Sequence, residues 1–267
     1  MLLTVQGADA YCYSGGKPFN PALPTVVFIH GAQNDHSVWI LQTRYFAHHG
    51  YGVLAADLPG HGRSKGVAKA SVPEMADWLL EVLDAAGVRN AALFGHSMGS
   101  LVALEAAFKA PQRVSHLAMI GSTYPMKVSD ALLETSRTDE QGAIDMVNIW
   151  SHSSIAQKPS CPGPGFNTMG GARRLMQRIS EINPAQVFHT DFAACNAYAN
   201  GEAAAQAVRC PTLFLFGGRD MMTPPKSTKL LTSTISHAKV VTVDSGHSLM
   251  SEQPDAVLDA LFSFMAT

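Results

Sequence analysis

Residues 93–110 read Leu-Phe-Gly-His-Ser-Met-Gly-Ser-Leu-Val-Ala-Leu-Glu-Ala-Ala-Phe-Lys-Ala, and this stretch decides the fold. Its first apolar residues and the two alanines before them predict a buried strand, and residues 100–110 are helix formers stopped by Pro111. Between strand and helix lies the pattern Gly-x-Ser-x-Gly, centred on Ser97. At such a junction the two glycines allow a very tight turn that lifts the serine hydroxyl clear of the sheet. The sequence therefore predicts that Ser97 is a nucleophile.

Outward from this unit, short apolar runs alternate with helical patterns. Thr25–Ile29 and Val114–Ile120 are runs of mainly apolar or β-branched residues, which is typical of strands covered on both faces. Residues 72–86 place apolar side chains on one face and are followed by Gly87, as in an amphipathic helix. The alternation predicts a mostly parallel, doubly wound α/β sheet with helices on both faces. Other strands are expected at residues 2–5 and 10–13, as an antiparallel edge pair, and at residues 52–56, 212–216 and 239–243.

The alternation of strands and helices stops at Gly121. Residues 122–208 contain no convincing buried strand, and the Pro- and Gly-rich residues 158–165 are expected to form a loop. An insertion after the carboxyl end of a strand lies over the ligand crevice of an open α/β sheet. We therefore expect a core domain of residues 1–121 and 209–267, with residues 122–208 as a helical cap, or lid. Helices of the cap are expected near residues 129–133, 140–150, 171–182 and 185–198.

A serine nucleophile needs a base that takes its proton and a carboxylate that orients the base. Of the eleven histidines, His247 is the best placed, because it follows the expected strand at residues 239–243. Asp220 follows the strand before it, and the order Ser97, Asp220, His247 is the chain order found with this type of turn. Asp244, on the same loop as His247, and Asp130, beyond the strand that ends near residue 120, are rival carboxylates.

Negative charge on the carbonyl oxygen of the substrate must be stabilised by preorganised N–H donors. The backbone of Met98, directly after the nucleophile, is one expected donor, and that of Ala32, in the loop after the Thr25–Ile29 strand, is the second. The nearby His30, His61 and His96 are interpreted as histidines that pack within tight loops.

Together these motifs resemble the α/β-hydrolase superfamily, in the branch with a helical cap, across essentially the whole chain. The resemblance implies a hydrolase, but this branch includes carboxylesterases, lactonases, carbon–carbon hydrolases of ring-cleavage products and cofactor-free perhydrolases. Serine at position 97 argues against dehalogenases and epoxide hydrolases, whose nucleophile is aspartate, and residues 33–37 lack the Gly-rich form of ring-cleavage hydrolases. The matching pieces are Phe28-Ile-His-Gly31, Asp57-Leu-Pro-Gly-His-Gly-Arg-Ser64, Gly95-His-Ser-Met-Gly99, Gly218-Arg-Asp220 and Gly246-His247.

The expected activity is a serine hydrolase acting on a small or medium, largely apolar carboxylic ester. Aromatic and Met residues of the cap support an apolar site, and Tyr124, Trp150 and Phe166 are candidate substrate-binding residues. No metal or cofactor is expected, since neither the triad nor the oxyanion donors need one. The alternative class is a ligand-sensing protein that keeps the hydrolase fold without turnover.

Composition narrows the partners and the compartment. Nineteen basic residues face 21 acidic ones without a basic block, so no nucleic acid is expected as a partner. The N-terminal residues lack a signal-peptide pattern and no apolar run could span a bilayer, so no membrane contact is expected. Cys12, Cys161, Cys195 and Cys210 have no zinc-ligand spacing and are expected to be reduced, which favours a cytoplasmic location. The protein is expected to be a monomer or a homodimer.

Overall fold

In the computed structural model, which describes residues 1–153 and 164–266 except for the side chains of residues 164–167, eight strands form one sheet. The strand order is β1-β2-β4-β3-β5-β6-β7-β8, and only the pairs β1–β2 and β2–β4 are antiparallel. This confirms the predicted mostly parallel α/β sheet. The strands are β1 (Leu2–Val5), β2 (Ala8–Tyr13), β3 (Thr25–Ile29), β4 (Gly52–Ala56), β5 (Ala91–His96), β6 (Val114–Ile120), β7 (Thr212–Gly217) and β8 (Lys239–Val243).

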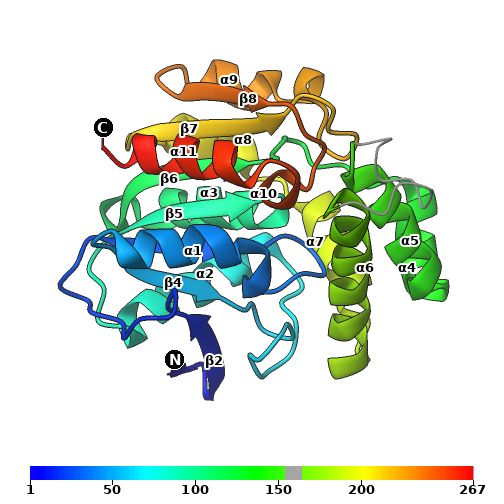
Figure 1. Cartoon of the computed structure of the whole chain (residues 1–267), viewed down its shortest axis with the longest axis horizontal. Coiled ribbons are helices and arrows are strands. Elements are labelled where there is room, and N and C mark those ends of the chain that lie inside the picture. The colour runs from blue at the N-terminus through cyan, green and yellow to red at the C-terminus, as the bar shows by residue number, and fades with distance from the viewer. Residues whose placement is uncertain (154–163, 267) are drawn as a thin grey trace.

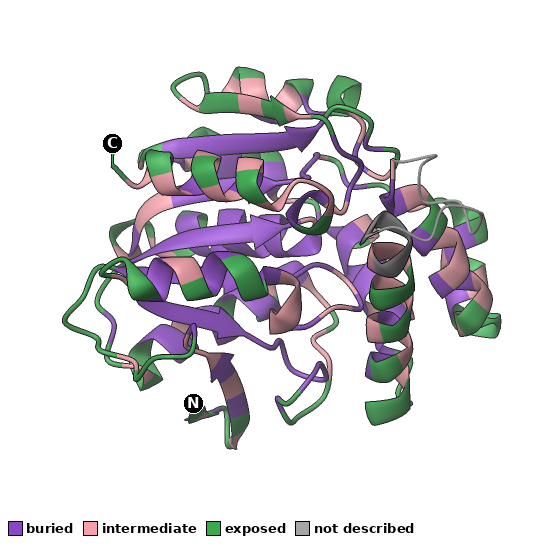
Figure 2. Cartoon of the chain, viewed as in Figure 1, coloured by how far each residue is buried: buried purple, intermediate pink, exposed green. Residues whose placement is uncertain are grey.

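Helices cover both faces of the sheet (Figure 1). Successive residues of β3 belong to two different apolar clusters. Val27 packs with residues on one face of the sheet, and Phe28 packs with residues on the other face. A strand covered on both faces has no alternation of exposed and buried residues, and all five residues of β3 are buried. In Figure 2 the strands in the middle of the sheet are likewise mostly purple, the colour of buried residues. One face carries α2 (Val72–Ala85), α3 (Met98–Lys109) and α8 (Gly201–Ala207), and the other carries α1 (Ile40–His48) and α11 (Pro254–Phe264).

Shorter helices lie in the connections between these elements. None of the described helices is long and apolar enough to cross a membrane. The segments 36–48 and 225–234 each begin with a 3-10 turn and continue as an α-helix. The short elements are η1 (His36–Trp39), η2 (Pro111–Arg113), η4 (Pro225–Ser227), α9 (Lys229–Thr234) and α10 (Leu249–Glu252).

The chain between β6 and β7 forms a helical layer beyond the carboxyl ends of the strands (Figure 1). Its helices share their own apolar cluster, which includes Leu132, Ile144 and Phe188. The last helix of the predicted cap, α8, instead packs on α3 of the core, with Ala204 in the main apolar cluster. The helices of the layer are α4 (Asp130–Thr138), α5 (Glu140–Ser151), α6 (Pro164–Ile182) and α7 (Val187–Ala197).

The loop expected at residues 158–165 is wrong at its end, because α6 begins at Pro164. Proline is tolerated in the first turn of a helix, where its missing N–H has no intrahelical partner in any case. Residues 158–163 lie outside the described residues. Helix α8 was not expected, since its seven residues are too few to show a helical period.

The turn between β5 and α3 depends on two close backbone approaches. Ser97 has φ 51° and ψ −121°, a conformation that costs a residue with a side chain about 1–3 kcal/mol. A Cβ atom on Gly95 would lie 2.1 Å from the carbonyl oxygen of Gly99, and one on Gly99 would lie 2.4 Å from that of Ile29. Both glycines are therefore required, and the turn fixes where Ser97 lies at the edge of the sheet.

Gly95→Ala should destabilise the protein by at least about 2 kcal/mol, because the added methyl group meets backbone atoms that cannot move aside. The free energy of unfolding in urea measures this loss. Gly170→Ala is the control: nothing lies within 4 Å of its added Cβ, and alanine stabilises a helix interior by about 0.5–1 kcal/mol relative to glycine. A Gly95→Ala protein as stable as the wild type would contradict the proposed constraint.

Candidate active site

Ser97 is the N-cap residue of α3, but its hydroxyl does not cap the helix. Within the described residues 91–100, Ser97 alone is partly exposed, while its neighbours are buried. The backbone holds the turn, since Ser97 N donates to the Ile120 carbonyl at 2.9 Å and the Ser97 carbonyl accepts from Ser100 N at 2.8 Å. Its side chain makes no cap hydrogen bond. The hydroxyl is thus presented beside the positive end of a helix dipole, which favours developing negative charge.

His247 and Asp220 meet at the neighbouring strand ends. Nδ1 of His247 lies 2.8 Å from Oδ2 of Asp220, and both side chains are buried. Backbone N–H groups of Met222 and Thr223 donate to Oδ1 at 2.8 Å, and the Thr223 hydroxyl donates to Oδ2 at 2.7 Å. Burial acts to raise the pKa of Asp220, but the charge of His247 and these hydrogen bonds outweigh it and hold the pKa well below its usual range. An ionised carboxylate only accepts, so Nδ1 of His247 carries a proton.

The rival carboxylates lie elsewhere. Asp244 has a side chain that is 77% exposed and pairs with Arg219 at 2.7 Å. Asp130 is the exposed first residue of α4. Of these three aspartates, Asp220 is the one whose carboxylate the described structure places against His247.

His247 is also held from the side of β5 and β6. Nε2–H of His96 donates to the carbonyl of His247 at 2.9 Å, and the two rings pack with centroids 4.7 Å apart. Burial, and then the nearby His247, lower the pKa of His96 to about 3, so its ring is neutral. Gly121, with φ 54°, lies under both rings: a Cβ there would be 3.2 Å from His247 Nδ1 and 3.3 Å from His96 Nε2. Neither His96 nor Gly121 was expected at this site from the sequence, although a glycine directly after a strand is a recognisable signal.

Ala32 and Met98 carry the two amides predicted as oxyanion donors. Ala32 lines a cavity together with Ser97, and Met98 is the buried first residue of α3. Helices of the layer between β6 and β7 hold the loop around Ala32. Gln33 N donates to Asp191 of α7 at 2.8 Å, and Gln33 Nε2 donates to the Met176 carbonyl of α6 at 3.0 Å. The position of the Ala32 peptide is therefore coupled to the position of α6 and α7.

Asp191 also binds His61, whose protonation differs from that of the other loop histidines. Nε2 of His61 lies 2.9 Å from Asp191 and Nδ1 lies 3.1 Å from the Pro59 carbonyl. Both partners only accept, so His61 carries both protons and is charged. Burial lowers its pKa, but Asp191 and the Pro59 carbonyl outweigh that effect and raise it. His30 instead donates to the Gly31 carbonyl and accepts from the Leu58 amide, so it is neutral, and burial lowers its pKa to about 4.

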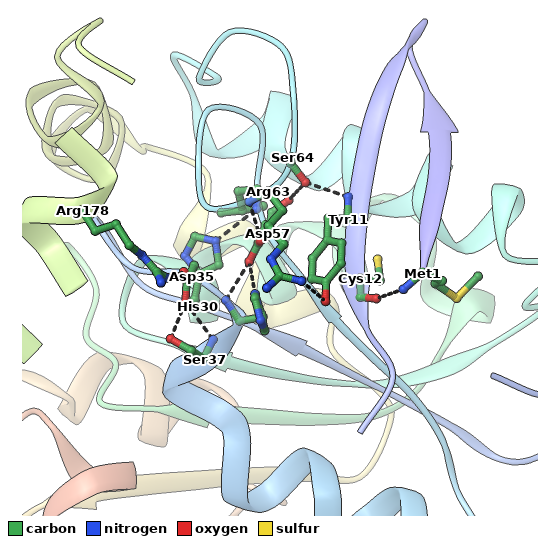
Figure 3. Close-up of polar contacts among 12 residues, drawn as sticks. Met1, Tyr11, Cys12, His30, Asp35, Ser37, Asp57, Arg63, Ser64 and Arg178 are labelled. Carbon is green, nitrogen blue, oxygen red and sulfur yellow. Dashed lines mark hydrogen bonds and ion pairs between the residues drawn. The ribbon is translucent and has the colours of Figure 1, made fainter. Parts of the chain in front are cut away.

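A cluster of potential metal ligands lies beside the same loop. Ligand atoms of Asp35, His36 and Asp57 fall within 4.8 Å of one another. Asp57 already accepts from the backbone and ring of His36, at 2.7 and 2.8 Å, and from the backbone of Arg63 at 2.8 Å. Asp35 pairs with Arg178 of α6 (Figure 3). Because both carboxylates accept hydrogen bonds from the chain's own donors, we interpret the cluster as a structural contact that connects this loop to α6.

Two cavities open beside Ser97. The larger, of about 310 Å³, is mostly apolar, and the smaller, of about 60 Å³, also has His247 in its wall. Of the candidate substrate-binding residues, Trp150 lines the larger cavity, whereas Tyr124 lines neither. The Tyr124 hydroxyl donates to the Ala199 carbonyl at 2.7 Å and its ring packs on Gly201 of α8. Phe166 lies in the first turn of α6, and its side chain is outside the described residues.

A model of the alpha/beta hydrolase family matches residues 26–260 of the chain. The chain belongs to the alpha/beta hydrolase family. This α/β-hydrolase is 25% identical over 257 residues to the (E)-2-((N-methylformamido)methylene)succinate hydrolase of Acinetobacter baylyi, covering 91% of this chain and 90% of that protein.

Two solved structures show the same fold as this α/β-hydrolase. The enol-lactonase from Burkholderia xenovorans LB400 has a TM-score of 0.87 and 19% identity, covering 100% of both chains. The esterase from Exiguobacterium antarcticum has a TM-score of 0.83 and 18% identity, covering 100% of this chain and 99% of that one. At these identities the likeness concerns the fold, and the substrate must be argued from the site.

Asp191→Asn should remove a pH-dependent part of the stability of this α/β-hydrolase. The raised pKa of His61 contributes stability that is full below its unfolded pKa of about 6.5 and is lost as pH rises through the folded pKa. We expect the variant to lose about 3 kcal/mol at pH 6, and the difference from wild type to narrow towards pH 9. Urea unfolding at several pH values measures both quantities.

The control for this experiment is Asp145→Asn, which removes an exposed ion pair with Arg173. It should change stability far less and without this pH trend. A pH-independent difference for Asp191→Asn would show that the charge of His61 does not stabilise the fold.

Proposed function

We propose that the protein is a serine hydrolase that cleaves a small or medium, largely apolar carboxylic ester through an acyl-enzyme intermediate. The observation that carries the proposal is the pairing of His247 with Asp220 at 2.8 Å, with Ser97 and His247 in the wall of one cavity. The base is oriented, its Nε2 is free to accept a proton, and the nucleophile shares its cavity. This is the constellation that serine hydrolysis needs.

In acylation, Nε2 of His247 takes the proton of the Ser97 hydroxyl as Oγ attacks the carbonyl carbon. The carbonyl oxygen becomes an oxyanion, stabilised by the amides of Ala32 and Met98 and by the N-terminus of α3. Asp220 stabilises the imidazolium without taking its proton. The tetrahedral intermediate then collapses, the bond to the leaving oxygen breaks, and His247 gives that oxygen its proton.

In deacylation, water takes the place of the departed alcohol. His247 removes a proton from the water, the hydroxide attacks the acyl carbon, and the second tetrahedral intermediate collapses as Ser97 recovers its proton from His247. These steps require no metal or cofactor. The same steps open a lactone, in which the leaving alcohol stays attached to the acid, so the fold shared with an enol-lactonase makes lactones the second substrate class to test.

A fluorophosphonate probe should label Ser97, because the probe reacts only with a serine whose hydroxyl is activated by a neighbouring base. Labelling should disappear in Ser97→Ala and persist in Ser100→Ala, a buried serine one helical turn away whose hydroxyl donates to the Ser97 carbonyl. Mass spectrometry of the labelled peptide identifies the site. Equal labelling of wild type and Ser97→Ala would remove the nucleophile from the proposal, and a fully unlabelled wild type would favour a ligand-sensing protein.

Asp220→Asn should keep the fold and lower kcat by about three to four orders of magnitude, since an amide favours the wrong imidazole tautomer and cannot support the imidazolium. Asp244→Asn is the control, because Asp244 is exposed and pairs with Arg219. Ester kinetics with circular dichroism separate loss of chemistry from loss of fold. If folded Asp220→Asn kept more than about a tenth of the wild-type kcat, the role of Asp220 would have to be given up.

A further inference from the structure

Ser97 lies in the walls of two cavities, but His247 lies in the wall of only one of them among the described residues. The larger cavity, of about 310 Å³, is lined by residues of α4, α5 and α7, among them Leu132, Trp150 and Phe192, the last of which also lines the smaller cavity. The smaller cavity, of about 60 Å³, includes His247. Ala32 lines both, so the expected oxyanion position falls where the two cavities meet.

The position of His247 decides which part of an ester occupies which cavity. In the proposed reaction the leaving oxygen receives its proton from His247, so the leaving alcohol must lie on the His247 side. The acyl group then extends into the other cavity. This inference rests on the proposed function, because it assumes that His247 is the proton donor.

The two volumes set the sizes of the two parts. The smaller cavity, at about 60 Å³, has room for only a small group. The larger cavity, at about 310 Å³, has roughly five times that room. A medium-length or branched acyl chain fits the larger cavity, and only a small alcohol fits the smaller one.

The walls of the two cavities differ in chemistry. The wall of the smaller cavity includes Asn148 of α5 and His152, the C-cap of that helix, together with His247 and Ser248. Asn148 is 7% exposed and His152 is 8% exposed, yet Asn148 Oδ1 and His152 Nε2 have no hydrogen-bond partner in the structure. His152 Nδ1 donates to the backbone carbonyl of Asn148 at 2.7 Å, so Nε2 of the neutral ring is an acceptor. Burial lowers the pKa of His152 and so favours this neutral form.

Two buried acceptors without donors are costly unless a ligand supplies the donor. We propose that the preferred substrate is an ester of a medium-length apolar acid with a small alcohol that carries a hydrogen-bond donor, such as a hydroxyl or amide N–H. Asn148 and His152 accept from that donor, and Trp150 contacts the acyl chain. The two residues are specificity determinants of the leaving-group side.

Three esters test the proposal in a pH-stat assay. 2-Hydroxyethyl hexanoate and propyl hexanoate have leaving groups with the same number of non-hydrogen atoms, and only the first carries a donor. We expect the wild-type kcat/KM to favour the hydroxyethyl ester by about tenfold, after division by the ratio of the two rates in alkaline hydrolysis. Hexyl glycolate, in which the long chain is on the alcohol, should be hydrolysed at least about tenfold less efficiently than either hexanoate.

Asn148→Leu and His152→Phe replace the acceptors by apolar side chains of similar size. Each should reduce the hydroxyethyl-to-propyl ratio towards the ratio in alkaline hydrolysis, and because each variant serves as its own reference, partial loss of folded protein does not affect the result. Ile149→Ala, at an exposed position on the same helix, should keep the wild-type ratio. Trp150→Ala should change the preference for hexanoate over acetate esters and leave the leaving-group ratio unchanged.

A wild-type ratio equal to the chemical ratio, or a preference that survives in both acceptor variants, would overturn the leaving-group assignment. Efficient hydrolysis of hexyl glycolate would reverse the assignment of the two cavities. In each of these cases Ser97 would still be labelled by fluorophosphonate and the serine mechanism would stand. Absence of both labelling and ester turnover would instead remove the proposed function itself.

Discussion

The backbone strain at Ser97 is the constraint on which the rest of the site depends. A residue with φ 51° between β5 and α3 is possible only because Gly95 and Gly99 let two backbone segments approach within distances that no side chain allows. The packing of β5 between β3 and β6 stabilises this conformation, and the N-terminus of α3 is thereby aimed at the hydroxyl. Stability of the parallel sheet is what maintains the backbone geometry at Ser97, the proposed nucleophile.

The helical layer between β6 and β7 contributes to the site through polar contacts as well as through apolar packing. Asp191 of α7 binds both the amide of Gln33 and the charged ring of His61, and Arg178 of α6 pairs with Asp35. These contacts fix the loop that carries Ala32. A change in the position of α6 or α7 would therefore alter the expected oxyanion site as well as the cavity walls.

The environments of the histidines show why residue type alone does not assign a role. His61 is charged because both ring nitrogens face acceptors, whereas His96 is neutral because one nitrogen donates to a carbonyl and the other has no partner. His247 differs from both, since Asp220 fixes its proton on Nδ1 and its ring lies at a cavity beside Ser97. The same imidazole thus serves as a structural cation, a packing group and a candidate base.

Local sequence determined the strands and the turn at Ser97, because hydrophobic period and glycine placement act over a few residues. It also offered the chain order of the proposed nucleophile, carboxylate and base. The tertiary structure decided what depends on contacts between distant segments. It separated Asp220 from Asp244, which sequence could only rank, since both follow strands. It also placed Tyr124 against Gly201 instead of in a cavity, and it brought Asn148 of α5 to the His247 side. Such pairings follow from how helices of the insertion dock on the sheet, and no local pattern encodes that docking.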